Sequence, residues 1–307
     1  MQNRLFMLMT VAAVPFSLAH ASFCTTYVAD GGQGVCVNGT AAAGSQNGTS
    51  NPLSASVVFE VSNGNLNVTL VNDLSSGITH QLGGGDVLTA MLFNLTNTSG
   101  NSANLAPNTI GFTPSLTTTP SDPLGTSTLT TSPGTCNGSP CTLADEWAYV
   151  SSTDHTANGN HQYNNTYEDA ISSTGLISPA GQNANWNCGS NCNGLDGPPW
   201  GIVPSAAAIG SNGIAPGINP LVQNFAYFTL SGLTGSGLTN ANLASHLSDI
   251  VFQYGTSFGS EPDINCSSCT YQISSVPEPG YLVLLVGGLI ALICFRRSSI
   301  TARNEPN

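Results

Sequence analysis

The sequence predicts an all-β fold, an elaborated β-sandwich of the jelly-roll-like kind with long loops, followed by a short C-terminal transmembrane helix. Two observations predict the sandwich: short stretches in which apolar and polar residues alternate, and clusters of Gly, Asn, Pro and Ser that separate them. A third observation is the scarcity of helical patterns. Only Asn240 to Leu247, with Leu243 and Leu247 four residues apart, predicts a brief helix.

The clearest local pattern predicts a β-hairpin. Val57, Phe59 and Val61 place apolar side chains on one face of a strand, and Leu66 to Leu70 does the same. The intervening Ser62-Asn63-Gly64-Asn65 supplies residues that favour a tight hairpin turn. We therefore expect two neighbouring antiparallel strands here.

Further strands are predicted where β-branched and aromatic residues concentrate. Two stretches are apolar on both faces and therefore suit central strands. They are Val87 to Leu95, and Phe225 to Leu230 within the run Val222 to Leu230. Long polar segments between the strands predict large loops. The predicted strands are Val87 to Leu95, Trp147 to Ser151, Val222 to Leu230 and Asp249 to Tyr254.

Residues 1–21 have the pattern of a secretory signal. Arg4 supplies the positive charge, a largely apolar run extends to Leu18, and Ala19-His20-Ala21 is a small-x-small cleavage site. Without this segment and the C-terminal segment 276–307, residues 22–275 form the exported body. A chain of this length is long enough for one large β domain, which is the simplest interpretation.

The exported body contains neither Lys nor Arg, because the four basic residues of the chain are Arg4, Arg296, Arg297 and Arg303. Nucleic-acid binding is excluded, since its affinity comes from Lys and Arg that neutralise phosphates. Lysine Schiff-base chemistry and arginine clamps on anionic substrates are excluded as well. The acidic surface is explained by solubility alone, or by a surface that gathers divalent cations.

Eight of the nine cysteines fall in the body and group as neighbours in the sequence. An even number in an exported chain predicts disulfides. Neighbour pairing is the preferred one of many possible connectivities. A four-thiolate zinc site from the last two pairs is the alternative, disfavoured because exported thiols oxidise. The pairs are Cys24 with Cys36, Cys136 with Cys141, Cys188 with Cys192, and Cys266 with Cys269.

The C-terminal segment carries an uncharged apolar run from Tyr281 to Phe295. Its length is short beside the roughly 20 residues that a membrane-spanning helix needs. Arg296-Arg297 follows immediately, which favours a cytoplasmic C-terminus under the positive-inside rule. We therefore expect the body outside the inner membrane and the tail inside.

This C-terminal segment resembles the PEP-CTERM sorting signal of exosortase substrates. The resemblance covers residues 276–307 and rests on three parts in order: Val276-Pro277-Glu278-Pro279, the apolar run with Gly287-Gly288, and Arg296-Arg297. It implies recognition by exosortase, a membrane cysteine protease, and removal or transfer of the tail. It also implies a transient stay in the inner membrane, then delivery to the cell surface or extracellular matrix of a Gram-negative bacterium.

Two patterns in the sequence bear on an enzymatic function. Gly255-Thr256-Ser257-Phe258-Gly259 matches G-x-S-x-G, but a turn-like stretch follows it and the last histidine, His246, precedes the serine. Asp145-Glu146 and Glu168-Asp169 are the nearest paired carboxylates for a carbohydrate-active enzyme. Adjacent residues on a strand point to opposite faces, so two members of different segments would have to converge.

Metal sites have weaker support. Asp154-His155 and His161 lie in a polar stretch, and their spacing is not diagnostic of a metal site. Asn193 to Gly197 and Gly83 to Asp86 are oxygen-rich stretches of the kind that hold Ca²⁺, although turn formation alone explains their composition. No resident cofactor is therefore predicted, with calcium as the one open possibility.

The three tryptophans, Trp147, Trp186 and Trp200, could stack on sugars or fill the core, and Trp186 is the best candidate for a ligand. Taken together, the sequence predicts a non-enzymatic surface or matrix protein that acts in adhesion or in an exopolysaccharide matrix. The alternatives are a secreted carbohydrate-active enzyme and a Ca²⁺-dependent carbohydrate-binding module.

Overall fold

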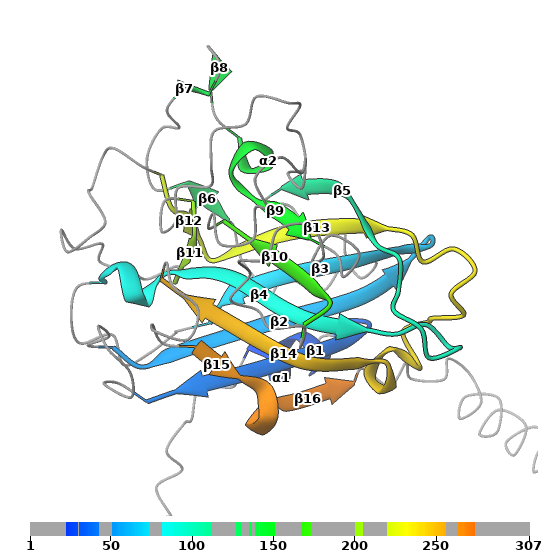
Figure 1. Ribbon diagram of the computed structural model, residues 1–307. Helices are drawn as coiled ribbons and strands as arrows, with labels where there is room; N and C mark the ends of the chain where they lie inside the picture. Colours follow the sequence, from blue (N-terminus) through cyan, green and yellow to red (C-terminus); the bar gives the residue numbers. More distant parts are fainter. Residues whose placement is uncertain are drawn as a thin grey trace, which may run out of the picture.

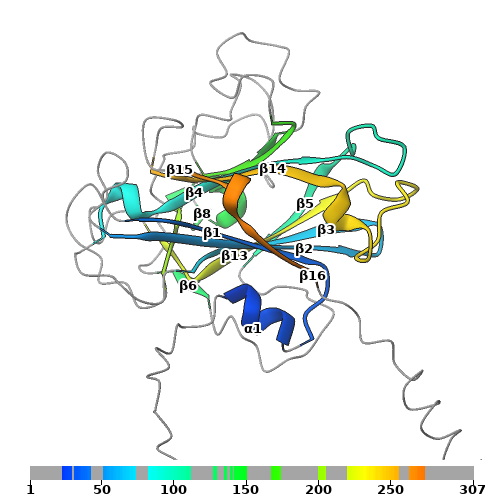
Figure 2. The ribbon, with the colours of Figure 1, turned by 90° about the horizontal axis from the view of Figure 1, so that it is seen from below.

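Two facing β-sheets form the body of the protein, with one short helix on the outside (Figures 1 and 2). The computed structural model describes residues 23–29, 31–42, 51–73, 82–111, 127–129, 135–136, 139–140, 142–150, 167–173, 200–204, 220–255 and 263–273. All structural statements below refer to these residues.

The described elements are mostly strands, as the sequence predicted. In chain order they are α1 (Phe23–Ala29), β1 (Val35–Ala41), β2 (Leu53–Ser62), β3 (Asn65–Asn72), the 3-10 helix η1 (Gly84–Asp86), β4 (Leu88–Leu95), β5 (Ala106–Gly111), β6 (Thr128–Leu129), β7 (Thr135–Cys136), β8 (Ser139–Pro140), α2 (Leu143–Glu146), β9 (Ala148–Val150), β10 (Asp169–Ser172), β11 (Ile202–Val203), β12 (Val222–Gln223), β13 (Phe225–Ser231), η3 (Leu243–Ser245), β14 (Leu247–Tyr254), β15 (Asp263–Asn265), η4 (Cys266–Ser268) and β16 (Thr270–Ile273).

The six-stranded sheet has the order β16-β1-β2-β3-β13-β5, and all its neighbours are antiparallel. The predicted hairpin is confirmed as β2 and β3, paired from Ala55 opposite Asn72 to Ser62 opposite Asn65. Its turn residues Asn63 and Gly64 have φ angles of 52° and 76°. Positive φ at both positions matches the right-handed twist of the flanking strands, which explains the Asn-Gly pair.

The second sheet has eight strands, with β15-β14-β4-β11-β12-β6 in one path and β10 and β9 beside β4. β4 pairs with β14 along one edge and with β10 and β11 along the other. Both runs that the sequence predicted as central strands are central, because β13 also lies between β3 and β5. The predicted strands at Trp147 to Ser151 and Asp249 to Tyr254 correspond to β9 and β14.

The core lies between the two sheets (Figure 2). Phe59 of the six-stranded sheet and Phe93 of the eight-stranded sheet are both fully buried, with ring centroids 5.3 Å apart. Trp147 meets Phe228 of β13 in the same way, at 5.1 Å. Aromatic pairs of this kind bury large apolar areas from both layers and hold the sheets face to face.

The predicted single strand from Val222 to Leu230 is wrong in one respect. The chain changes sheets at Asn224, so that β12 belongs to the eight-stranded sheet and β13 to the six-stranded sheet. Asn224 has a φ angle of 80°, and its N–H donates to the carbonyl of Val203 at 2.8 Å. Asn tolerates this left-handed conformation, so the chain turns sharply here from one sheet to the other.

The predicted helix from Asn240 to Leu247 is also wrong in extent. The structure has a single 3-10 turn, η3, and Leu247 already begins β14. Leu243 and Leu247 are both buried, but they belong to different elements. The two apolar residues four positions apart are therefore buried for different reasons, one in a turn and the other at the start of the next strand.

Two of the four predicted cysteine pairs are joined in the structure: Cys24 with Cys36, and Cys266 with Cys269. The first links α1 to β1, and the second closes η4 between β15 and β16. Cys269 Sγ lies 2.7 Å from where a Cβ on Gly39 would stand, so glycine in β1 permits the disulfide to pack against that strand. The other predicted pairs include side chains outside the described residues.

Candidate functional site

The outer face of the six-stranded sheet is divided into an apolar half and a polar half. In the apolar half, Val58, Val71 and Phe225 pack with Cys36 under α1, which lies below this sheet in Figure 2. In the polar half, the outward positions of β3 and β13 are Asn, Thr and Tyr. The inward positions of the same strands belong to the core, because side chains alternate along a strand.

Helix α1 is fixed to the apolar half by three contacts. The first is the Cys24–Cys36 disulfide. The backbone N–H of Phe23 donates to Asp73 Oδ2 at 2.9 Å, and the Tyr27 hydroxyl donates to the Gln33 carbonyl at 2.8 Å. Burial raises the pKa of Asp73, and the donors at Phe23 and Ser56 act in the opposite direction. The helix thereby packs on the apolar half of this face.

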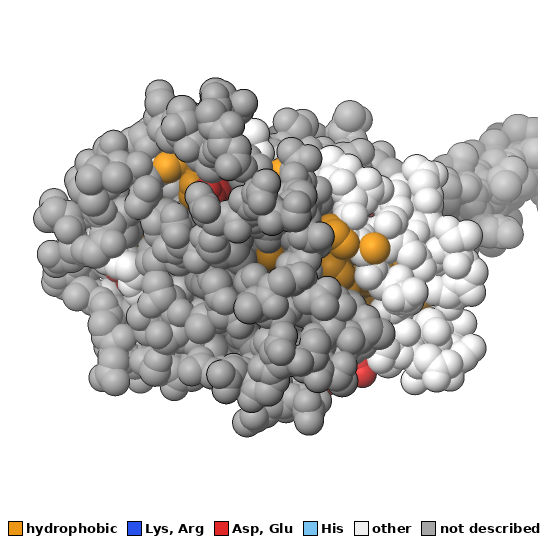
Figure 3. Space-filling view, turned by 45° about the horizontal axis from the view of Figure 1, so that its top comes forward, with side chains coloured by type: hydrophobic (Ala, Val, Ile, Leu, Met, Phe, Trp, Pro, Cys, Tyr) orange, Lys and Arg blue, Asp and Glu red, His pale blue; other side chains and the backbone are white. Residues whose placement is uncertain are grey.

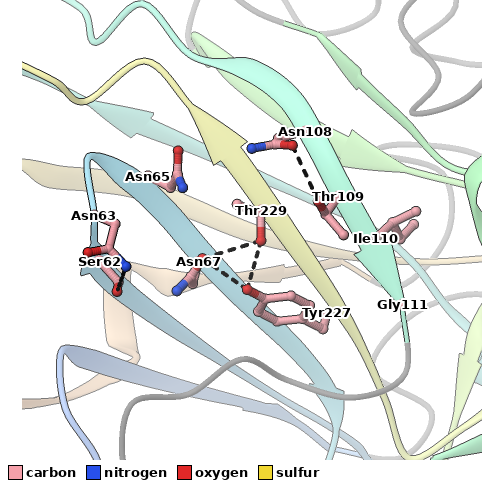
Figure 4. Close-up of a pocket in the computed structure, with 10 residues that line it drawn as sticks. All are labelled: Ser62, Asn63, Asn65, Asn67, Asn108, Thr109, Ile110, Gly111, Tyr227 and Thr229. Atoms are coloured by element: carbon pink, nitrogen blue, oxygen red, sulfur yellow. Dashed lines mark hydrogen bonds between the residues drawn. The ribbon is translucent and has the colours of Figure 1, made fainter.

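A pocket with a volume of about 480 Å³ lies in the polar half, over three adjacent strands and the β2–β3 turn (Figure 4). A volume of this size falls within the range of roughly 300–1,000 Å³ that is usual for small-ligand sites. Among the described lining residues, nearly all carry an amide or a hydroxyl group and none carries a charge. The lining residues are Ser62, Asn63, Asn65, Asn67, Asn108, Thr109, Ile110, Gly111, Tyr227 and Thr229.

A three-membered hydrogen-bond network forms the floor of the pocket (Figure 4). The Tyr227 hydroxyl donates to Asn67 Oδ1 at 2.9 Å, and Thr229 Oγ1 contacts the Tyr227 hydroxyl at 2.7 Å and Asn67 Oδ1 at 3.3 Å. All three side chains are between 4% and 7% exposed. Because they stand on paired strands and hold one another, their polar groups are fixed before any ligand arrives.

Two features of β5 shape the rim of the pocket. The pairing of β5 with β13 shifts register between Thr229 and Leu230, which leaves Asn108 without a partner in the Cα register and exposed at the rim. Gly111 stands opposite Tyr227, and a Cβ placed on it would meet nothing within 4 Å. The missing side chain keeps the space beside Tyr227 open.

The described surface carries no Lys or Arg side chain. Figure 3 shows one face, on which the described atoms are mostly uncharged, with acidic atoms in a few places. Glu60 stands opposite Asn67 in the register of β2 and β3 and is buried, but it does not line the pocket. An anionic ligand would find no cationic partner among the described lining residues. It would also lie near the carboxylate of Glu60.

Two of the three tryptophans are not available to stack on sugars. Trp147 is fully buried, and its Nε1 donates to the carbonyl of Trp200 at 3.0 Å. Trp200 is 3% exposed and packs in the same core. Their size and apolar surface favour the interior of the sandwich, so of the two predicted roles, both residues fill the core. Trp186 lies outside the described residues.

Asp169, from one predicted carboxylate pair, lies in the interior. It is 2% exposed and accepts a hydrogen bond from the Tyr149 hydroxyl. Burial raises its pKa to about 7, against the lowering effect of that hydroxyl. The backbone N–H of the neighbouring Glu168 donates to Asn94 Oδ1 at 2.6 Å. Asp169 thus lies beside core residues such as Phe93, opposite it in β4, and not on the polar outer face.

The predicted calcium stretch at Gly83 to Asp86 forms the 3-10 turn η1. Asp86 is buried, and its Oδ2 accepts from the Gly83 N–H at 2.8 Å and from Asn51 Nδ2 at 3.3 Å. These bonds give the carboxylate a role in closing the turn. Among the described residues, no group of three or more His, Cys, Asp and Glu side chains could hold a metal ion. The Cys266–Cys269 disulfide removes two ligands from the four-thiolate zinc alternative.

Several predicted features lie outside the described residues and remain predictions. They are the signal segment 1–21, Cys141, Asp154, His155, His161, Cys188, Cys192, the stretch 193–197, residues 256–259 of the G-x-S-x-G match, and the sorting segment 276–307 with Pro277, Glu278, Pro279, Arg296 and Arg297. No helix in the described ranges is long and apolar enough to cross a membrane.

The pocket itself was missed at the level of sequence. The sequence did indicate one strand of the pocket. The alternation in the hairpin that turns Leu66, Val68 and Leu70 inward also turns Asn65 and Asn67 outward. What the sequence could not show is that β13, some 160 residues further along, lies beside β3, and that β5 lies on the other side of β13.

Comparison with protein-family models, curated proteins and solved structures finds no match to this chain.

Proposed function

We propose that the protein is an exported, non-enzymatic surface or matrix protein of a Gram-negative bacterium, sorted by exosortase and acting in adhesion or in an exopolysaccharide matrix. The chain would pass through the inner membrane, held there for a time by the apolar run after Pro279, and its body would end on the cell surface or outside the cell. The membrane-spanning helix within 276–307 is part of this proposal.

The observation that carries the proposal is the Cys24–Cys36 disulfide. It closes a buried link between α1 and β1 directly after the predicted signal segment, with both sulfur-bearing residues fully buried. Disulfides persist in exported proteins and are rare in the reducing cytoplasm. A second disulfide, Cys266–Cys269, closes the other end of the described body, just before the sorting segment. Both bonds support a body built for an oxidising compartment.

The charge of the body supports the same setting. All but two of the 16 acidic residues lie between residues 22 and 275, where there is no Lys or Arg. A surface of this kind stays soluble and avoids phosphate-rich partners. It leaves hydrogen bonding by neutral groups as the main means of recognition at the pocket.

The sorting step is tested in an exosortase-bearing Gram-negative host with the chain tagged within the body. Replacement of Pro277, Glu278 and Pro279 by Ala should abolish surface delivery and leave the chain in the inner-membrane fraction. The matched control replaces Glu261 and Pro262, a Glu-Pro pair outside the motif. Equal surface delivery of the motif variant and the control would refute the proposal.

A further inference from the structure

We infer that the pocket over β3, β13 and β5 is a binding site for a neutral saccharide chain. This inference names a ligand class for the surface role proposed above and rests on it. It depends on three properties of the pocket: the chemistry of its lining, its lack of charge, and the rigidity of the strands that carry it.

The lining supplies both hydrogen-bond donors and acceptors. Asn side chains offer an amide oxygen and an amino group, and Ser, Thr and Tyr hydroxyls serve in both roles. A saccharide presents many hydroxyl groups at close spacing, each a donor and an acceptor, so its surface matches such a lining. An apolar ligand would leave these groups unpaired, which is costly for polar atoms that lose contact with water.

Asn67 shows how the pocket is prepared for such a ligand. Its Oδ1 is occupied by Tyr227 and Thr229, which fixes the orientation of the amide. Its Nδ2 has no partner among the described residues and lies on the side away from the Tyr227 ring in Figure 4. A donor held in place by two hydrogen bonds loses little freedom when it binds an acceptor.

The absence of charge selects neutral saccharides over acidic ones. None of the lining residues that the structure describes is charged, and the buried Glu60 stands beside Asn67 on the same face of the sheet. An acidic saccharide would therefore meet repulsion with no Lys or Arg in the body to offset it.

The position on the sheet favours a saccharide over a peptide. An extended peptide is usually captured by the free backbone groups of an edge strand. Here most of the recognition groups are side chains on the face of three strands. β5 is the edge strand of the described sheet, but the floor of the pocket stands on β3 and β13, which are both paired along their two edges. The backbone groups of β3 and β13 are already used, so side-chain contacts to hydroxyls remain.

The test uses the full chain, secreted so that its cysteines oxidise, and isothermal titration with a panel of hexasaccharides. The neutral probes are based on glucose, mannose, galactose and xylose, and the acidic probe is a galacturonate hexamer. We expect at least one neutral probe to bind and the acidic probe not to bind. An uncharged Gly-Ser-Asn hexapeptide is included, and binding of the peptide alone would overturn the inference.

Three variants locate the binding in the pocket. Gly111→Leu should abolish it, because the new side chain enters open space beside Tyr227 at a position where the backbone tolerates any residue. Asn108→Ala and Thr229→Val should each weaken binding about tenfold, the effect of one lost hydrogen bond.

Two matched controls separate binding from folding. Asn104→Ala removes an exposed amide from the same segment as Asn108 but outside the pocket. Thr69→Val makes the same change as Thr229→Val at a fully buried position on the same face, where the hydroxyl has no hydrogen-bond partner among the described atoms. Both controls should bind as the unmodified protein does.

The outcomes distinguish this inference from the proposed function. If no neutral hexasaccharide binds, or if Gly111→Leu binds normally, the inference is wrong even when the protein reaches the cell surface. If a neutral saccharide binds at the pocket but the sorting motif has no effect on delivery, the proposed sorting fails and the binding site stands.

Discussion

Asp169 makes the stability of the sandwich depend on pH. Its carboxyl is 2% exposed, so the charged form loses nearly all its hydration on folding. Burial raises the pKa of Asp169 from 3.8 to about 7, with the Tyr149 hydroxyl opposing the rise and the charge of Glu168 adding to it. At neutral pH the folded protein therefore binds a proton here more readily than the unfolded chain does.

The direction of the effect follows from this difference. A carboxyl whose folded pKa is raised favours folding below the unfolded pKa and loses this contribution as pH rises toward the folded pKa. Between about pH 4 and pH 7 the free energy of unfolding should fall by about 1.4 kcal/mol per pH unit, or about 4 kcal/mol in all. Above pH 7 this contribution stays constant at its lower value.

The assay is urea denaturation of the oxidised protein at closely spaced pH values between 4 and 8. Asp169→Asn replaces the carboxyl with a neutral group of the same shape that still accepts from Tyr149, so it should flatten this part of the profile and stabilise the protein at pH 8. Tyr149→Phe removes an opposing donor and should move the end of the decline to higher pH. An Asp169→Asn variant with an unchanged slope would refute the reasoning.

Two further predictions concern covalent and backbone constraints. Replacing both Cys24 and Cys36 with Ser should cost about 3 kcal/mol, because the bond closes a loop with a sequence separation of 12, and urea denaturation would show it; unchanged stability would contradict it. Gly64→Ala should lower the melting temperature more than Gly235→Ala does. Both have positive φ, but only at Gly64 would a Cβ meet a neighbour, Thr234 Oγ1 at 2.5 Å, so equal losses would show that the contact is harmless.

The parts of the fold that the sequence predicted are those specified by local signals. The β2–β3 hairpin combines strict alternation with an Asn-Gly turn, and both act over a few residues. β4 was predicted as central because it is apolar on both faces, and burial on both sides of a sheet requires that composition.

The parts that were missed depend on distant neighbours. β1, with the sequence VCVNGTA, and β16 are short and contain polar residues, and they form strands because each has a partner to pair with. The change of sheet at Asn224 has only a weak local signal, the polar pair Gln223-Asn224 between two apolar stretches, and this pair does not show that the two stretches join different sheets. The candidate site was missed for the same reason, because its floor joins Asn67 to side chains 160 residues away.

The place of the Cys266–Cys269 disulfide has a mechanical consequence. β16 is an edge strand of the six-stranded sheet, whereas the pocket lies beside the opposite edge, over β13 and β5. If a ligand holds the pocket while the tail after Ile273 is pulled, the tension crosses the whole sheet, and β16 is the first strand to peel from β1. The Cys266–Cys269 disulfide prevents η4 from extending, so the load passes through the bond from Cys269 to Cys266. Loss of β16 would therefore transfer the tension at once to β15, which is paired with β14 of the eight-stranded sheet.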